Sequence, residues 1–137
     1  MRNLTIILTF ITLFLSCTYE EGGINDEMKT KLISFGQETI GYANAENNTH
    51  GKVIEKRNNG ILTLTYFTEE TGCPHFEGGY KIINKTLTLY YQDVYFQPLK
   101  CIDFFKLEYK IKDENINYEN IKVVRLKPIK KGLSVKD

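Results

Sequence analysis

Strict alternation of side chains marks residues 86–91, whose sequence is TLTLYY. Residues 61–68, ILTLTYFT, follow the same pattern. Because successive side chains of a β-strand point to opposite faces, Leu62, Leu64 and Tyr66 share one face and the intervening residues share the other. Both segments are therefore predicted to be strands with one buried face.

Turn signals separate these segments from further candidate strands. Asn58-Asn59-Gly60 supplies the positive φ angles that a tight hairpin turn needs, and Asn84-Lys85 turns the chain before residue 86. Residues 68–79 and 92–99 are expected to be irregular, the latter because Pro98 cannot sit inside a central ladder. The remaining predicted strands cover residues 52–57, 80–83, 101–111 and 121–127.

The start of the domain allows two interpretations. Asn25 could cap a helix over residues 25–35, with acidic residues in its first turn. Alternatively, a first strand begins near Lys31 and runs towards Tyr42, and we favour this strand.

About seven short strands at regular spacing predict an all-β domain over residues 31–137 with a basic C-terminal tail. We expect an antiparallel sandwich of immunoglobulin-like architecture, and a small β-barrel is the alternative. The chain has no Trp, so the likeness to immunoglobulin domains is architectural only.

The N-terminus has the parts of a secretory signal peptide. Arg2 supplies one positive charge, and twelve uncharged residues follow at positions 4–15. This run suits the apolar part of a signal peptide and is shorter than the roughly 20 residues of a transmembrane helix. It ends at Ser16, a small residue directly before Cys17. Residues 1–16 are therefore predicted to be a signal peptide.

Residues 13–17, LFLSC, resemble a bacterial lipobox in the loose form common in the Bacteroidota, although Phe14 stands where Leu or Val is usual. The resemblance implies that Cys17 becomes the first residue and carries lipid on its thiol and its amine. The alternative is an ordinary secretory signal with Cys17 as a plain thiol.

Residues 17–30 would then form the lipidated cysteine and a flexible tether, which contains Gly22-Gly23. The resemblance implies a location in the cell envelope, anchored in the outer membrane. The acidic pair Glu20-Glu21 is similar to an export signal that sends some such lipoproteins to the cell surface. Both the periplasmic face and the cell surface remain open.

Cys73 and Cys101 are the two cysteines that remain once Cys17 carries lipid. In an oxidising compartment we expect them to form a structural disulfide. A metal site is the alternative, because His75 follows Cys73 closely and Glu77 could add a carboxylate. Such a site needs three or four ligands, so no metal or cofactor is predicted.

Catalytic patterns are equally sparse. Neither Ser34 nor Ser134 lies in a Gly-x-Ser-x-Gly setting, and Glu69-Glu70 is interpreted as solvated charge in a loop. A net charge of +1 argues against nucleic-acid binding. The expected function is a non-catalytic binding or interaction module on the membrane, and an envelope enzyme or metal carrier is the alternative.

One aromatic segment could bind a protein or glycan partner. It contains four aromatic residues around the end of a predicted strand: Tyr90, Tyr91, Tyr95 and Phe96. The alternative is that these rings pack over the Cys73–Cys101 pair.

Overall fold

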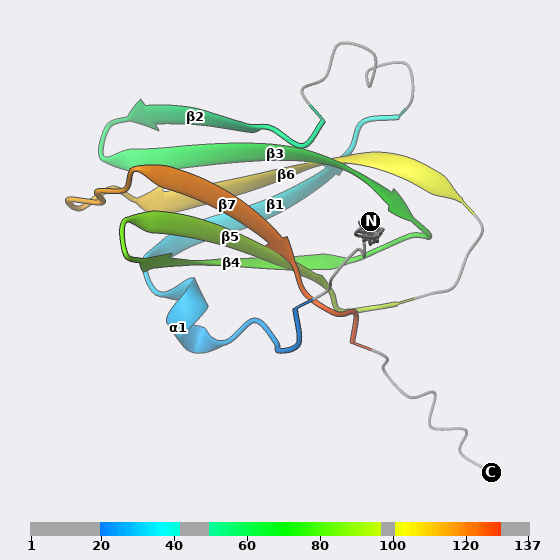
Figure 1. Ribbon diagram of the computed structural model, residues 1–137. Helices are drawn as coiled ribbons and strands as arrows, with labels where there is room; N and C mark the ends of the chain where they lie inside the picture. The colour runs from blue at the N-terminus through cyan, green and yellow to red at the C-terminus, as the bar shows by residue number, and fades with distance from the viewer. Residues whose placement is uncertain (1–19, 42–49, 97–100, 130–137) are drawn as a thin grey trace, which may run out of the picture.

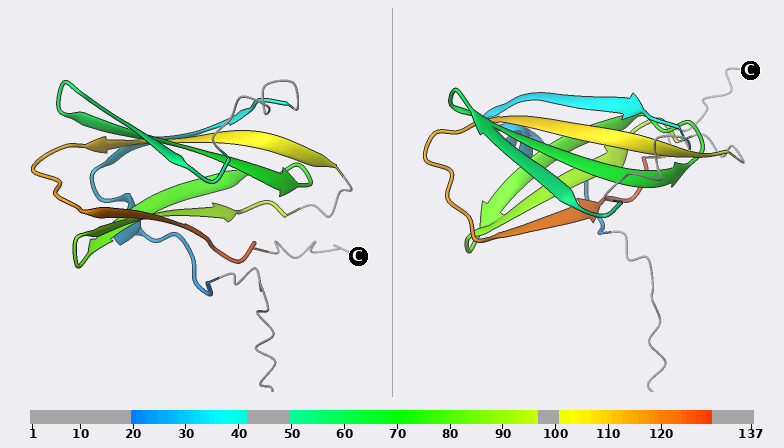
Figure 2. Two further views of the ribbon diagram at one scale, coloured as in Figure 1. Left: turned by 45° about the horizontal axis from the view of Figure 1, so that its top comes forward. Right: turned by 90° about the horizontal axis from the view of Figure 1, so that it is seen from above.

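The domain is a sandwich of two β-sheets with a short helix against one of them (Figure 1). The computed structural model describes residues 20–41, 50–96 and 101–129. One sheet has four strands in the order β1-β6-β3-β2, and the other has three in the order β4-β5-β7. Figure 2 shows the two sheets as separate layers. The predicted all-β sandwich is confirmed, and the sheets do not close into a barrel.

The elements have the following bounds: α1 Asp26–Lys29, β1 Leu32–Thr39, β2 Val53–Asn58, β3 Ile61–Thr71, β4 Phe76–Ile83, β5 Thr86–Asp93, β6 Ile102–Lys112 and β7 Asn120–Arg125.

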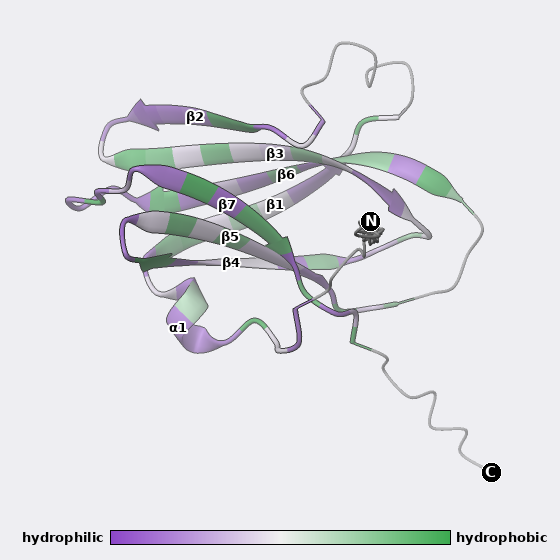
Figure 3. Cartoon of the chain, in the orientation of Figure 1, coloured by the Kyte–Doolittle hydropathy of each residue, from purple (hydrophilic) through white to green (hydrophobic). Residues whose placement is uncertain are grey.

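The core lies between the sheets and is built from alternate residues of facing strands. Leu62 and Leu64 of β3 and Leu87 and Leu89 of β5 have no exposed surface. Burial of each such side chain contributes about 1.5–3 kcal/mol, which is why these strands keep their register. Figure 3 shows the same alternation of hydrophobic and hydrophilic residues along β5 and β7. The predicted faces of residues 61–68 and 86–91 are confirmed.

Two predicted turns are also confirmed. Asn59 and Gly60 have φ angles of 50° and 73°, and Asn84 and Lys85 have 50° and 61°. Two consecutive positive φ angles match the right-handed twist of the strands that a hairpin joins. These turns connect β2 to β3 and β4 to β5 at one end of the sandwich (Figure 1).

The prediction of a wholly antiparallel arrangement is wrong. β7 pairs with β5 in parallel, from Thr86↔Asn120 to Tyr91↔Arg125. The reason is the connection, because the chain leaves β6 in the first sheet and enters β7 in the second. No hairpin joins β7 to its neighbour, so no turn imposes an antiparallel direction.

The loop predicted over residues 68–79 is much shorter than expected. β3 continues to Thr71, and β4 already begins at Phe76. Gly78 lies inside β4, where a Cβ atom would stand 2.1 Å from a ring carbon of Phe35. This close approach explains why a glycine occupies a buried strand position.

The N-terminal segment contains both a helix and a strand. Asn25 caps α1, as in the helical alternative, since its Oδ1 accepts a 3.0 Å hydrogen bond from the Met28 amide, but this helix is far shorter than the 25–35 segment of that alternative. The helix ends at Lys29, and β1 begins at Leu32, so the favoured strand is confirmed. Within the segment expected to be a tether, residues 20–30 lie against the domain. Met28 is buried over Gly79, and Glu20 pairs with Leu126.

Candidate binding site

The four aromatic residues predicted as a patch do not form one surface. Tyr91 is buried between the sheets, where its ring meets that of Phe76 edge-on at 5.4 Å. Tyr90 points to the opposite face of β5 and is half-buried. Tyr95 and Phe96 follow the strand and are 52% and 40% exposed. The segment therefore divides into one core residue, one surface residue and an exposed aromatic pair.

Cys73 and Cys101 lie side by side at the ends of β3 and β6. The Gly72 amide donates a 2.7 Å hydrogen bond to the Cys101 carbonyl, which holds the two chain segments together. The Sγ atoms are 3.8 Å apart, whereas a disulfide bond measures about 2.05 Å. The predicted bond is therefore not formed in this structure, and both thiols are free and exposed. The prediction that these two cysteines lie next to each other is nevertheless confirmed.

Glu70 is not the solvated loop residue that the sequence suggested. It lies in β3, is 4% exposed and faces the core, while Glu69 is exposed on the other side of the strand. One carboxylate oxygen accepts hydrogen bonds from Tyr91 Oη at 3.0 Å and Thr68 Oγ1 at 3.3 Å. The other oxygen lies 2.7 Å from Arg125 Nη2 of β7. The carboxylate is thus held between the two sheets.

Burial raises the pKa of Glu70, although the attraction of Arg125 and the hydrogen bonds oppose this effect. The same burial raises the pKa of Tyr91. Because both oxygens of Glu70 already have partners within the protein, the cluster joins the sheets rather than offering a free catalytic acid.

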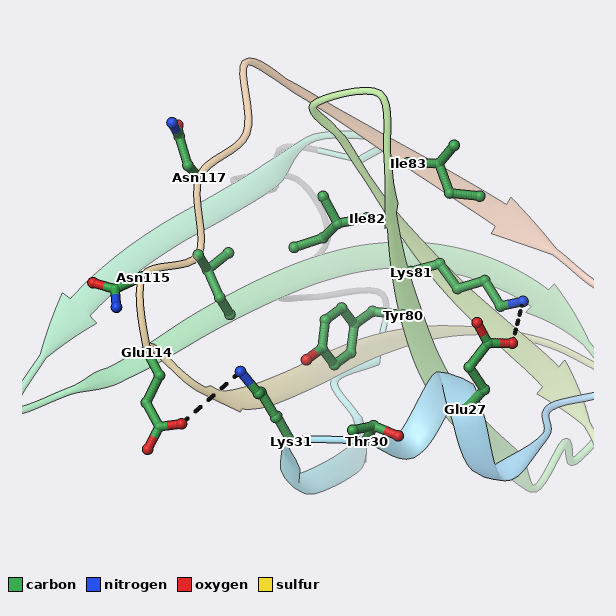
Figure 4. Close-up of a pocket in the computed structure, with 11 residues that line it drawn as sticks. Glu27, Thr30, Lys31, Tyr80, Lys81, Ile82, Ile83, Glu114, Asn115 and Asn117 are labelled. Carbon is green, nitrogen blue, oxygen red and sulfur yellow. Dashed lines mark hydrogen bonds and ion pairs between the residues drawn. The ribbon is translucent and has the colours of Figure 1, made fainter.

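A hollow at the hairpin end of the sandwich combines apolar and charged residues from three elements. It has a volume of about 480 Å³ and lies between β4, the end of α1 and the loop that follows β6. Figure 4 shows the Tyr80 ring on its floor and the Ile82 side chain directed into it. Ile82 is 38% exposed and lies on the same face of β4 as Tyr80, whereas Ile83, 59% exposed, is directed to the opposite side of the strand (Figure 4).

The rim of the hollow is polar and carries both signs of charge. Lys81 Nζ lies 2.9 Å from Glu27 Oε2, and Lys31 Nζ lies 3.9 Å from Glu114 Oε2 (Figure 4). Asn115 and Asn117 complete the outer wall. An apolar floor inside a paired, polar rim is the usual composition of a protein-binding surface.

The outer wall is fixed at both ends by contacts with the hairpin turns. Arg57 of β2 donates from Nη1 to both oxygens of Asp113, at 2.9 and 3.0 Å. The Asp113 amide donates a 2.8 Å hydrogen bond to the Gly60 carbonyl. The Glu119 amide donates a 2.8 Å hydrogen bond to the Lys85 carbonyl. The loop from residue 113 to residue 119 is therefore preorganised, which lowers the entropy lost on binding.

The sequence carries a signal for this hollow. Half-buried strands alternate apolar and polar residues, whereas Ile82 and Ile83 are consecutive at the end of a strand. Consecutive apolar residues at a strand end are candidate contact residues, because they cannot both face the core. Ile82 is the one that the structure directs into the hollow.

Metal and membrane features are sparse in the part of the chain that the structure describes. In residues 20–41, 50–96 and 101–129, no three side chains of His, Cys, Asp or Glu come together as metal ligands. Within the same ranges no helix has the length and apolar character needed to cross a bilayer. Cys17 lies outside the described residues. No family model, curated protein or solved structure matches this chain.

Proposed function

We propose that the protein is an envelope lipoprotein, anchored through lipid on Cys17, that binds a protein partner in the hollow beside β4. The observation that carries the binding role is the Ile82 side chain, which is 38% exposed and directed into the hollow beside Tyr80, inside a rim of ion pairs. The anchor rests on the signal peptide and the lipobox resemblance.

A protein partner fits the hollow better than a glycan does. Sugar rings stack on exposed aromatic faces, but Tyr80 is only 8% exposed. The exposed floor is aliphatic, and burial of aliphatic surface is the main favourable term in protein association. The acids of the rim, Glu27 and Glu114, are paired with lysines and are suited to orienting a partner rather than to acid–base chemistry.

The position of the hollow suits a protein held at a membrane. Phe76 and Ile83 mark the two ends of β4, and the end at Phe76 pairs with Asp93 near the docked Glu20. Seven residue steps of about 3.3 Å place the hollow about 23 Å from that end. An anchor three residues before Glu20 would therefore present the hollow away from the bilayer.

Site-specific photo-crosslinking in the native envelope tests this proposal. A photoreactive residue replaces Ile82 in the hollow, and the matched control replaces Ile54, a strand isoleucine that is 47% exposed on β2. We expect a discrete adduct from position 82 that disappears when Lys31→Glu reverses one charge of the rim, and no such adduct from position 54. Equal labelling at both positions, or labelling that survives Lys31→Glu, would contradict a binding role for the hollow.

We further propose that Cys73 and Cys101 become a disulfide in the oxidising envelope, by exchange with the disulfide of a thiol-oxidising protein, which takes up the two electrons and two protons. Their Sγ atoms lie 3.8 Å apart and both side chains are exposed. The backbone hydrogen bond from Gly72 to Cys101 already holds the two chain segments together.

A further inference from the structure

The described chain begins on the domain, close to the residue that would carry lipid. Glu20 forms a parallel bridge with Leu126, and the Lys127 amide donates a 3.2 Å hydrogen bond to the Glu20 carbonyl. Figure 1 shows this blue start of the described chain beside the end of β7. Three residue steps separate Cys17 from Glu20, which span at most about 11 Å.

Gln92 holds the segment that begins at Glu20 against the end of β7. Its side-chain amide is 2% exposed and donates to the Gly22 carbonyl at 3.1 Å and the Lys127 carbonyl at 2.8 Å. Its oxygen accepts a 3.2 Å hydrogen bond from the Ile24 amide. One side chain thus holds both the segment that leads from the anchor and the segment that follows β7. A short lead on a fixed exit point leaves the domain little freedom to turn away from the membrane.

Three exposed apolar side chains gather at the same end of the sandwich. Tyr95, Phe96 and Ile129 are 52%, 40% and 43% exposed. Two of them are positioned through Asp93, whose carbonyl accepts from the Ile129 amide at 2.9 Å and whose carboxylate accepts from the Tyr95 amide at 3.0 Å, and Phe96 directly follows Tyr95. We call Tyr95, Phe96 and Ile129 the apolar tip.

Charge does not prevent this tip from meeting lipid. The Asp93 carboxylate is 3% exposed, and it also accepts a hydrogen bond from the His75 amide at 3.2 Å. Glu20 lies 3.3 Å from Lys122. Glu21 and Lys127 are both exposed and carry opposite charges. The exposed charges near the tip are thus of both signs, and apolar contact would dominate.

We propose that the apolar tip inserts into the headgroup layer of the membrane that holds Cys17. Tyrosine and phenylalanine are favoured at that depth, because their rings are apolar while the phenol can still reach water. The lipid supplies the anchor, and the tip fixes the orientation, with the hollow beside β4 turned outward. This inference rests on the proposed lipidation of Cys17.

The absence of Trp from the chain gives a clean test. Phe96→Trp places the sole tryptophan in the tip, and Ile83→Trp places it at the opposite end as the matched control. Each full-length variant is expressed with its signal peptide and purified from membranes. It is then reconstituted into phosphatidylcholine vesicles with and without brominated acyl chains, and mass spectrometry reports the lipid on Cys17.

We expect the tryptophan at position 96 to emit at shorter wavelength in vesicles than in detergent-free Cys17→Ser protein, and to be quenched by the brominated lipid. The tryptophan at position 83 should show neither effect. If Cys17 is lipidated and position 96 is not quenched, the docking of the tip is wrong while the anchor stands. If Cys17 carries no lipid, the proposed anchor fails and the docking fails with it. Equal quenching at both positions would also overturn the orientation.

Discussion

Replacement of Arg125 by methionine tests a buried electrostatic contact of the domain. The substitution keeps an unbranched apolar stem and removes the guanidinium that lies 2.7 Å from Glu70. Glu70 is 4% exposed, so its carboxylate would lose a charged partner without gaining water. Loss of one member of a buried ion pair costs about 3–5 kcal/mol. For a domain of this size that lowers Tm by more than about 12 °C.

The dependence on pH follows from the raised pKa of Glu70. The folded protein holds a proton on Glu70 more readily than the unfolded chain, whose carboxyl has a pKa near 4.5. The stability contributed by this group is therefore fully present below pH 4.5 and is lost as pH rises through the raised pKa. Removal of Arg125 raises that pKa further. The loss of unfolding free energy that Arg125→Met causes should thus be larger at pH 7 than at pH 4.5.

Urea unfolding at both pH values measures this deficit. The matched control is the double variant Glu70→Leu/Arg125→Met, in which no charge remains buried. We expect it to recover most of the lost stability, because apolar replacement of a whole buried pair is often neutral. A loss below about 1 kcal/mol at pH 7, the range of surface ion pairs, would refute the reasoning. A double variant as unstable as the single one would refute it as well.

Three further predictions concern packing, redox state and the anchor. Gly78→Ala should destabilise the domain by about 1–3 kcal/mol in thermal unfolding, since a Cβ there meets a ring at 2.1 Å. Gly36→Ala is the control, because no atom lies within 4 Å of a Cβ at that position, and its stability should be within about 0.5 kcal/mol of that of the unmodified protein. Thiol labelling under non-reducing conditions should find Cys73 and Cys101 unreactive in protein from the envelope, and labelling of both thiols would refute the disulfide. Cys73→Ser should lower the free energy of unfolding by about 2–4 kcal/mol under oxidising conditions only. Cys17→Ser should release the protein from membranes in fractionation, and retention in the membrane pellet would contradict lipid anchoring.

Local patterns were sufficient for the sheets and their turns. Period-two alternation located β5 and most of β3, and the asparagine-rich turns located both tight hairpins. The same alternation, continued from Leu62, reaches residue 70 on the inner face. Glu70 could therefore have been placed in the core, had the acidic pair not suggested a loop.

Contacts between distant segments were beyond such patterns. The parallel direction of β7 depends on where the chain crosses between sheets, which no turn residue encodes. The hollow combines the end of β4 with residues of α1 and of the loop after β6, and only the folded arrangement brings them together. Cys73 and Cys101 were paired from parity alone, without any information on the distance between their sulfur atoms.

The clamp formed by Gln92 also constrains when the protein can finish folding. Its two carbonyl partners lie 70 residues earlier and 35 residues later in the chain. The clamp is therefore complete only after Lys127 has been synthesised, and Glu20 cannot dock earlier, because Leu126 and Lys127 are its pairing partners. Until that moment Glu20, three residues after Cys17, would be undocked and open to the enzymes that would cut and acylate the proposed lipoprotein. Anchoring would thus precede the last step of folding, and the domain would complete its structure already at the membrane surface.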